Sequence, residues 1–312
     1  MQTVNALSLT LAVNNWLAYT RQPRILHVFG HACNLINERR EVLSIVTPQI
    51  GNGPFNLVVE DDVLFSKHLN AQSLISIRAN QLNLGDLAIN TSNAKLWSPC
   101  PDWEALHGKR DDITKLLLTN YQAPGLPLRG LRDTPITKNA QGYSTTDSLQ
   151  SPISNSLLTS LVNADLPSSL TTAQQLAGLG VGLTPAGDDF IMGAILAVWI
   201  LHPPEVASVL AKEVTNATTA LTTSLSAAWL RSAGRGKAGI LWHKLFDALI
   251  SGDEIEIQKT MDNILAVGET SGADAMAGFI STMICWVEKV GAKNPHPALS
   301  QRERGSRPDK KA

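Results

Sequence analysis

The sequence predicts an α+β protein in which a β-rich N-terminal domain is followed by a mainly α-helical C-terminal domain. Short runs rich in β-branched and other apolar residues, separated by turn residues, fill the first hundred positions. From residue 152 onward, apolar residues recur instead at helical spacing. The 312 residues are enough for two domains. The predicted organisation is a β-rich domain with flanking helices at 1–120, a linker or long loop at 121–151, a helical domain at 152–292 and a disordered basic tail at 293–312.

The first half is predicted to open with a helix at 8–20 and to close with a helix at 102–118, in which Asp102 stands near the start. Between them, β-prone runs occupy 25–29, 41–46, 55–59, 74–77, 85–89 and 94–97. The turn Asn52-Gly53-Pro54 separates two of these runs, because glycine accepts positive φ and proline cannot donate to a sheet. A mixed or antiparallel sheet is therefore expected.

The second half is predicted to be helical almost throughout. Residues 121–151 are rich in proline, glycine, serine and threonine, which favours a linker. Helices are then expected at 153–163, 168–178, 187–201, 205–231, 237–250, 254–266 and 272–290. The longest apolar run, 190–201, is shorter than the roughly 20 residues that span a bilayer, so it predicts a buried helix.

Composition excludes several classes of function. Charged residues make up only 17% of the chain and the net charge is −1, which argues against a nucleic-acid binder or a membrane-surface protein and favours association with other protein. Cys33, Cys100 and Cys285 are odd in number and far apart, so neither a disulfide framework nor a zinc ribbon is indicated. The N-terminus does not have the pattern of a signal peptide. We therefore expect a cytoplasmic protein.

The most unusual segment is a glycine-rich loop at 178–187 that leads into Asp188-Asp189 and the apolar helix. Gly182 and Gly187 have the spacing of a phosphate loop, but the two aspartates stand where that motif requires lysine and serine or threonine. Three roles for the aspartates stay open. They can stabilise the start of the helix, hold a divalent cation such as Mg²⁺, or act on a substrate proton.

A second loop, at 268–278, has a related pattern. Both loops contain Gly-x-Thr followed by an aspartate with glycine four residues later, as Asp189 with Gly193 and Asp274 with Gly278, which indicates a weak internal repeat. If the two helices pack side by side, their N-termini present backbone N–H groups and carboxylates to one pocket. The alternative is a capping box formed by Ser271 and Asp274.

A cationic segment lies between the two loops. The helix predicted at 205–231 carries a hydroxyl-rich face and ends in Arg231, with Arg235 and Lys237 just beyond it among glycines. These cations can bind a carboxylate or a phosphate, or they can simply stabilise a helix C-terminus. The candidate substrate-binding residues are therefore Gly182, Thr184, Gly187, Thr270, Ser271, Gly272, Arg231 and Arg235; the candidate catalytic residues are Asp188, Asp189 and Asp274, and the candidate metal ligands are Asp188 and Asp189.

Two motifs carry a resemblance to a known family. Gly-x-Gly-Leu-Thr-Pro-x-Gly-Asp-Asp-Phe at 180–190 and Gly-x-Thr-Ser-Gly-x-Asp-x-x-x-Gly at 268–278 resemble a bacterial family that includes the H subunit of oxamate carbamoyltransferase, from anaerobic allantoin degradation. His27-Val28-Phe29-Gly30 and Gly51-Asn52-Gly53-Pro54 extend a fainter resemblance into the β-rich half. The first motif is specific for the family rather than for a reaction, and the residue roles given above do not come from the family.

The resemblance implies a subunit of a hetero-oligomeric transferase in purine nitrogen catabolism. Such an enzyme moves a carbamoyl group between oxalurate (carbamoyl-oxamate) and phosphate, giving oxamate and carbamoyl phosphate. The implied partners are the other carbamoyltransferase subunits and a small anionic substrate, without nucleic acid or membrane. Two other classes stay open: a non-catalytic scaffold or regulatory subunit, and a stand-alone metal-dependent helical hydrolase of a small amide.

Overall fold

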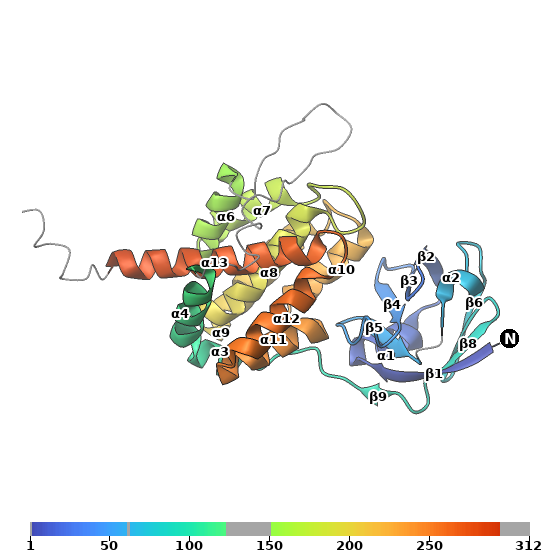
Figure 1. The fold of residues 1–312 in the computed structure, drawn as a ribbon. Coiled ribbons are helices and arrows are strands. Elements are labelled where there is room, and N and C mark those ends of the chain that lie inside the picture. Colours follow the sequence, from blue (N-terminus) through green and yellow to red (C-terminus); the bar gives the residue numbers. More distant parts are fainter. Residues whose placement is uncertain (1, 61–62, 123–150, 294–312) are drawn as a thin grey trace, which may run out of the picture.

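The computed structural model describes residues 2–60, 63–122 and 151–293, and it has the predicted α+β organisation (Figure 1). The predicted linker falls almost entirely outside these residues, as does the predicted basic tail. All described strands lie within the first hundred residues, and the regular elements from residue 103 onward are helices. The two parts form separate hydrophobic cores.

The N-terminal part is a mixed nine-stranded sheet covered by one longer helix, α1 (Leu11–Tyr19). Its strands are β1 (Gln2–Leu9), β2 (Arg24–Val28), β3 (Ala32–Ile36), β4 (Val42–Val46), β5 (Asn56–Val59), β6 (Ile75–Arg78), β7 (Gln81–Leu84), β8 (Leu87–Asn90) and β9 (Lys95–Leu96), with the short helix α2 (Phe65–His68) before β6. The order across the sheet is β2-β3-β4-β5-β1-β8-β7-β6, and β9 pairs with β1. The first strand is therefore central, pairing antiparallel with β5 and parallel with β8 and β9.

Three of these strands were not expected from the sequence. The opening helix predicted at 8–20 begins only at Leu11, because the residues before it form β1 and Thr10 caps the helix by accepting a hydrogen bond from the Val13 backbone N–H (3.2 Å). Strands β3 and β7 were also missed. Each pairs antiparallel with the next strand after a short turn, so local contacts between strands hold them in place.

The helical part is built around α8 (Ala186–Leu201), the predicted buried helix. It is surrounded by α3 (Trp103–Gly108), α4 (Arg110–Gln122), α6 (Pro152–Val162), α7 (Leu166–Leu176), α9 (Pro204–Thr218), α10 (Ser224–Ala233), α11 (Ile240–Ser251), α12 (Glu254–Leu265) and α13 (Ser271–Lys293). Figure 1 shows the long α13 crossing α8 near the middle of this part. Among the described residues, no helix combines the length and the apolar character needed to cross a membrane.

Two expected helices are each two helices in the structure. The helix expected at 102–118 is divided at Lys109 into α3 and α4, and Asp102 caps α3 through the Ala105 backbone N–H (3.0 Å). The prediction of one helix at 205–231 is wrong, because the chain turns between α9 and α10. Thr223 ends the turn as the cap of α10, accepting from the Ser226 backbone N–H (3.1 Å).

The sheet part of the chain ends before residue 120, where the end of the N-terminal domain was predicted. Leu106 of α3 and both Ile113 and Leu117 of α4 are buried in the helical core. These two helices also contact α8 and α13 rather than the sheet. The sheet and the helical part therefore meet in the segment after β9, near residue 100.

The helical part contains a repeated arrangement of helices and glycines. The unit α6–α7–loop–α8 has the same order as α11–α12–loop–α13, and the matching glycines occupy matching positions. A Cβ atom on Gly193 of α8 would lie 1.7 Å from the Ala275 carbonyl oxygen of α13, and one on Gly278 would lie 2.0 Å from the Phe190 carbonyl oxygen of α8. The two helix backbones are thus in direct contact, and only glycine fits at the crossing.

The two parts touch through a small apolar contact and several hydrogen bonds, among them one from the Arg40 side chain to the Ser224 hydroxyl (3.4 Å). The rings of Phe55 and Trp229 pack edge to face with centroids 4.7 Å apart. The Ile240 N–H donates to the Asn52 carbonyl oxygen (2.9 Å), and the Ala238 N–H donates to the Pro99 carbonyl oxygen (2.9 Å). Helix α10 therefore lies between the sheet and the helical core, as Figure 1 shows.

Candidate functional site

The two glycine-rich loops meet at the start of α8 and α13. The hydroxyl groups of Thr184 and Ser271 lie 2.8 Å apart and are hydrogen-bonded to each other. Asp189 and Asp274 lie beneath them, with exposed fractions of 5% and 1%. The two helices pack against each other with their acidic N-terminal turns on one side. The three predicted aspartates nevertheless have different surroundings.

Asp188 is a fully hydrogen-bonded anchor. One carboxylate oxygen accepts from the Gly178 backbone N–H (2.8 Å), and the other accepts from the hydroxyl groups of Ser226 (2.8 Å) and Thr222. Burial raises the pKa of Asp188, and the same three hydrogen bonds oppose that rise. This carboxylate therefore fastens the first loop to the turn before α10.

Asp189 and Asp274 are buried with few partners. Asp189 Oδ2 and both carboxylate oxygens of Asp274 have no hydrogen-bond partner among the described residues. Burial raises the pKa of Asp274 to about 6, with a nearby Thr270 hydroxyl acting in the opposite direction. Burial and the charge of Asp274 also raise the pKa of Asp189 well above its ordinary value, against the hydroxyls of Ser271 and Thr184. Two such acids close together favour holding a proton between them.

The loop glycines have a structural explanation. A Cβ atom on Gly187 would lie 2.1 Å from the Leu176 carbonyl oxygen, and one on Gly272 would lie 1.8 Å from the Ile264 carbonyl oxygen. Each glycine lets the start of a helix press against the end of the preceding one. Gly182 differs, because it has positive φ and an added Cβ atom would meet no other atom within 4 Å. Of these three predicted binding residues, only Gly182 has room for a ligand beside it.

The predicted metal site has few available ligands. Among the residues that the structure describes, no group of three or more histidine, cysteine, aspartate or glutamate side chains is placed to hold a metal ion. Both oxygens of Asp188 already accept hydrogen bonds, so a Mg²⁺ ion beside Asp189 would take its second carboxylate from Asp274. Metal binding by Asp188 and Asp189 stays a prediction. The hydrogen bonds of Asp188 argue against Asp188 as a metal ligand.

The predicted cationic residues do not lie with the aspartates. Ser226 of α10 faces Asp188, whereas Ala228 and Arg231 line a pocket on the other side of the helix. At roughly 100° per residue, these two positions lie about 200° and 140° around the helix axis from Ser226. The structure therefore separates the predicted site residues into two groups on opposite faces of α10.

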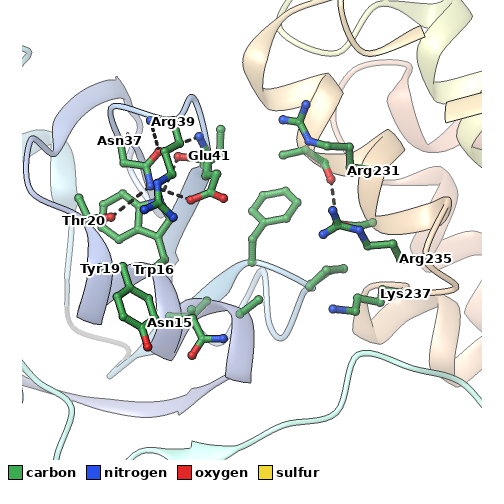
Figure 2. Close-up of a pocket in the computed structure, with 17 residues that line it drawn as sticks. Asn15, Trp16, Tyr19, Thr20, Asn37, Arg39, Glu41, Arg231, Arg235 and Lys237 are labelled. Atoms are coloured by element: carbon green, nitrogen blue, oxygen red, sulfur yellow. Dashed lines mark hydrogen bonds between the residues drawn. The ribbon is translucent and has the colours of Figure 1, made fainter. Parts of the chain in front are cut away.

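The pocket between the two parts has a volume of about 320 Å³. Figure 2 shows Arg231, Arg235 and Lys237 on its helical side and Asn37, Arg39 and Glu41 on the side of the sheet. Its lining also includes Asn15, Trp16, Tyr19, Thr20 and Phe55. The lining thus carries four cationic side chains and one acidic side chain.

The pocket cations have no acidic partner in direct contact. Within the described part of the chain, none of Arg39, Arg231, Arg235 and Lys237 forms a salt bridge. Half-burial and the neighbouring charge of Arg235 lower the pKa of Arg231, and only Glu41 acts in the opposite direction. Unpaired cations that converge on a cavity favour the binding of an anion.

Two family models match the chain, one in each part. Residues 5–96 match the AllH family N-terminal domain, and residues 176–283 match the oxamate carbamoyltransferase subunit AllH. Together the matches cover well over half of the sequence. The chain belongs to the AllH family. No curated protein and no solved structure matches it.

The AllH matches include both groups of candidate residues. The C-terminal match contains the two glycine-rich loops, the three aspartates and the cations of α10, and the N-terminal match contains Arg39 and Glu41. Sequence reasoning did not find these last two residues. They stand in an ordinary polar turn before β4, and nothing local indicates that they face a cationic helix end almost 200 positions later.

Proposed function

We propose that this chain is a subunit of a carbamoyltransferase-type enzyme that converts oxalurate and phosphate into oxamate and carbamoyl phosphate. Membership in the AllH family supports the subunit role, because the family is described as a subunit of oxamate carbamoyltransferase. The proposal includes the other subunits as partners in a hetero-oligomer, a place in purine (allantoin) nitrogen catabolism and a cytoplasmic location. The last agrees with three cysteines that are all free thiols.

The observation that carries the proposal is the cationic pocket beside α10. Oxalurate, oxamate, phosphate and carbamoyl phosphate are all small anions, so an enzyme that acts on them needs fixed positive charge. Arg231, Arg235 and Lys237 supply it from one side of a cavity with room for such a molecule. Arginine can also hold a carboxylate or phosphate through two parallel hydrogen bonds, which fixes its orientation.

The reaction as a whole also moves one proton. A phosphate oxygen bonds to the carbamoyl carbon, the bond from that carbon to the oxamate nitrogen breaks, and the proton of hydrogen phosphate ends on that nitrogen. An acid pair that holds a proton can act as such a relay. We keep Asp189 and Asp274 as the candidates for this step, with Asp188 positioning the first loop. Since α10 separates them from the pocket, this role requires a substrate to reach the loop side of the helix.

The burial of these acids favours a second candidate function. Carboxylates that are almost fully buried at a close helix crossing suit a non-catalytic subunit, whose loops shape the active site of a neighbour. A stand-alone metal-dependent hydrolase is less favoured, because the described residues do not bring three metal ligands together.

Reconstitution tests the subunit role against a stand-alone hydrolase. The complete set of subunits is expected to form carbamoyl phosphate from oxalurate and phosphate, and omission of this chain is expected to lower the rate at least 100-fold. A catalytic or substrate-binding subunit supplies part of the reaction site, which the other subunits cannot replace. Carbamoyl phosphate can be measured by coupling it to the phosphorylation of ADP. Full activity without the chain, or hydrolysis of oxalurate by the isolated chain with Mg²⁺ or Mn²⁺, would contradict the proposal.

A further inference from the structure

The acidic side chain in the cationic pocket is held in a fixed position. The buried Asn37 donates from Nδ2 to Glu41 Oε2 (2.8 Å), and its Oδ1 accepts from the Glu41 backbone N–H (2.9 Å). Trp16 Nε1 donates to the Glu41 carbonyl oxygen (3.0 Å). These bonds restrain the backbone of Glu41 and one oxygen of its exposed side chain.

Glu41 faces the cations without pairing with them. The charge of Glu41 acts on Arg231, yet no atoms of the two side chains come within salt-bridge distance. Among the described residues, no hydrogen bond reaches Glu41 Oε1. Figure 2 shows the two groups on opposite sides of the pocket. Three cations therefore line the helical side of the cavity, and on the side of the sheet an anionic acceptor lies beside Arg39.

An acidic side chain among the pocket cations does not suit the binding of a simple anion. A carboxylate within a phosphate pocket weakens phosphate binding through repulsion, so a site for phosphate alone would be better without it. A ligand with an anionic group at one end and N–H donors at the other fits both sides at once. Ureido and amide groups provide such donors without a charge of their own.

We propose that Glu41 is a specificity-determining residue, whose carboxylate accepts hydrogen bonds from the N–H end of a small ureido or amide acid. The anionic end of the same ligand lies against Arg231, Arg235 and Lys237. Asn37 is a positioning residue that holds the Glu41 carboxylate. This inference rests on the proposed function, since oxalurate and oxamate belong to this ligand class.

The test is titration calorimetry of the full chain with oxalurate and, separately, with inorganic phosphate. Glu41→Gln is expected to lower the affinity for oxalurate about tenfold, because a charge-assisted hydrogen bond becomes a weaker neutral one. The same variant is expected to raise the affinity for phosphate, because a repulsive charge is removed. Glutamine keeps the shape of the side chain and an oxygen for the Asn37 amide, so the fold is retained.

The matched control is Glu38→Gln, which makes the same change in net charge at an exposed position outside the pocket lining. It is expected to leave the ratio of the two affinities unchanged. The inference is overturned if the full chain does not bind oxalurate, or if Glu41→Gln changes both affinities in the same direction.

Failure of the inference and failure of the proposed function give different results. If the chain binds oxalurate with this selectivity but the assembled enzyme forms no carbamoyl phosphate, the proposed function fails and the inference stands. If the enzyme is active and its KM for oxalurate is the same with Glu41→Gln as with Glu38→Gln, the inference fails and the proposed function stands.

Discussion

Replacing Gly193 with alanine is expected to lower the free energy of unfolding by about 3 kcal/mol or more. The added Cβ atom would lie 1.7 Å from the Ala275 carbonyl oxygen and 3.0 Å from the Phe279 backbone nitrogen, so α8 and α13 must move apart. Alanine inside a helix normally stabilises by up to about 1 kcal/mol relative to glycine, so any loss reports the helix contact. Gly278→Ala is expected to behave alike, because its Cβ atom would lie 2.0 Å from the Phe190 carbonyl oxygen at the same crossing.

Urea unfolding followed by circular dichroism measures this effect. The control is Gly108→Ala in α3, where an added Cβ atom would meet no other atom within 4 Å. This variant is expected to change the free energy of unfolding by less than about 1 kcal/mol. Equal stability of Gly193→Ala and Gly108→Ala would show that the two helix backbones are not in contact as described.

Asp274→Asn is expected to raise stability at pH 8 while it removes enzyme activity. In the folded chain, burial raises the pKa of Asp274 from 3.8 to about 6. A carboxyl with a raised pKa costs stability once it is ionised, and a rise of this size corresponds to about 3 kcal/mol. Asparagine has the same shape and carries no charge.

The pH dependence follows from the sign of this pKa change. Below pH 3.8 Asp274 is protonated in both states, so it contributes no difference. As the pH rises from about 4 to above 6, the unfolded chain loses its proton first, and the stability of the native protein falls. The raised pKa of Asp189 extends the fall toward higher pH. Asp274→Asn removes the contribution of Asp274 to this fall.

Urea unfolding at pH 5 and pH 8 tests this expectation, with the exposed Asp262→Asn of α12 as control. The Asp274→Asn variant is expected to be more stable than the native chain at pH 8 by about 1–3 kcal/mol, with a smaller difference at pH 5. Turnover of the assembled enzyme is expected to fall by about 100-fold or more if Asp274 holds the transferred proton. A variant that is less stable at pH 8 would show that a favourable partner holds the ionised carboxylate.

Much of the helical part could be predicted because its signals are local. The glycines and aspartates around the first turns of α8 and α13 indicate two helix starts, and Gly193 and Gly278 four residues after an aspartate allow close packing of the two helices. The turn between α9 and α10 could not be predicted in this way. Its threonines resemble a polar helix face, and the hydrogen bond from Thr223 to the Leu183 carbonyl oxygen (2.5 Å) joins residues 40 positions apart.

The division of the candidate site into two could not be read from the sequence either. Asp188 lies against one face of α10, and Arg231 projects from the other face of the same helix. Only their positions around the helix axis separate them. Arg39 and Glu41 belong to the sheet part, so their place in the pocket depends on how the sheet packs against α10. Sequence spacing carries no information about that contact.

The measurement that tests the central claim most directly is the KM of the assembled enzyme for oxalurate when this chain carries Arg235→Ala or Lys237→Ala. Each variant is expected to raise KM about tenfold or more, because each removes a cation that holds the anionic end of the substrate. Lys244→Ala removes an equal charge at an exposed position on α11 outside the pocket lining and is expected to leave KM unchanged. Unchanged KM in both pocket variants would show that the substrate does not bind between the two parts of this chain.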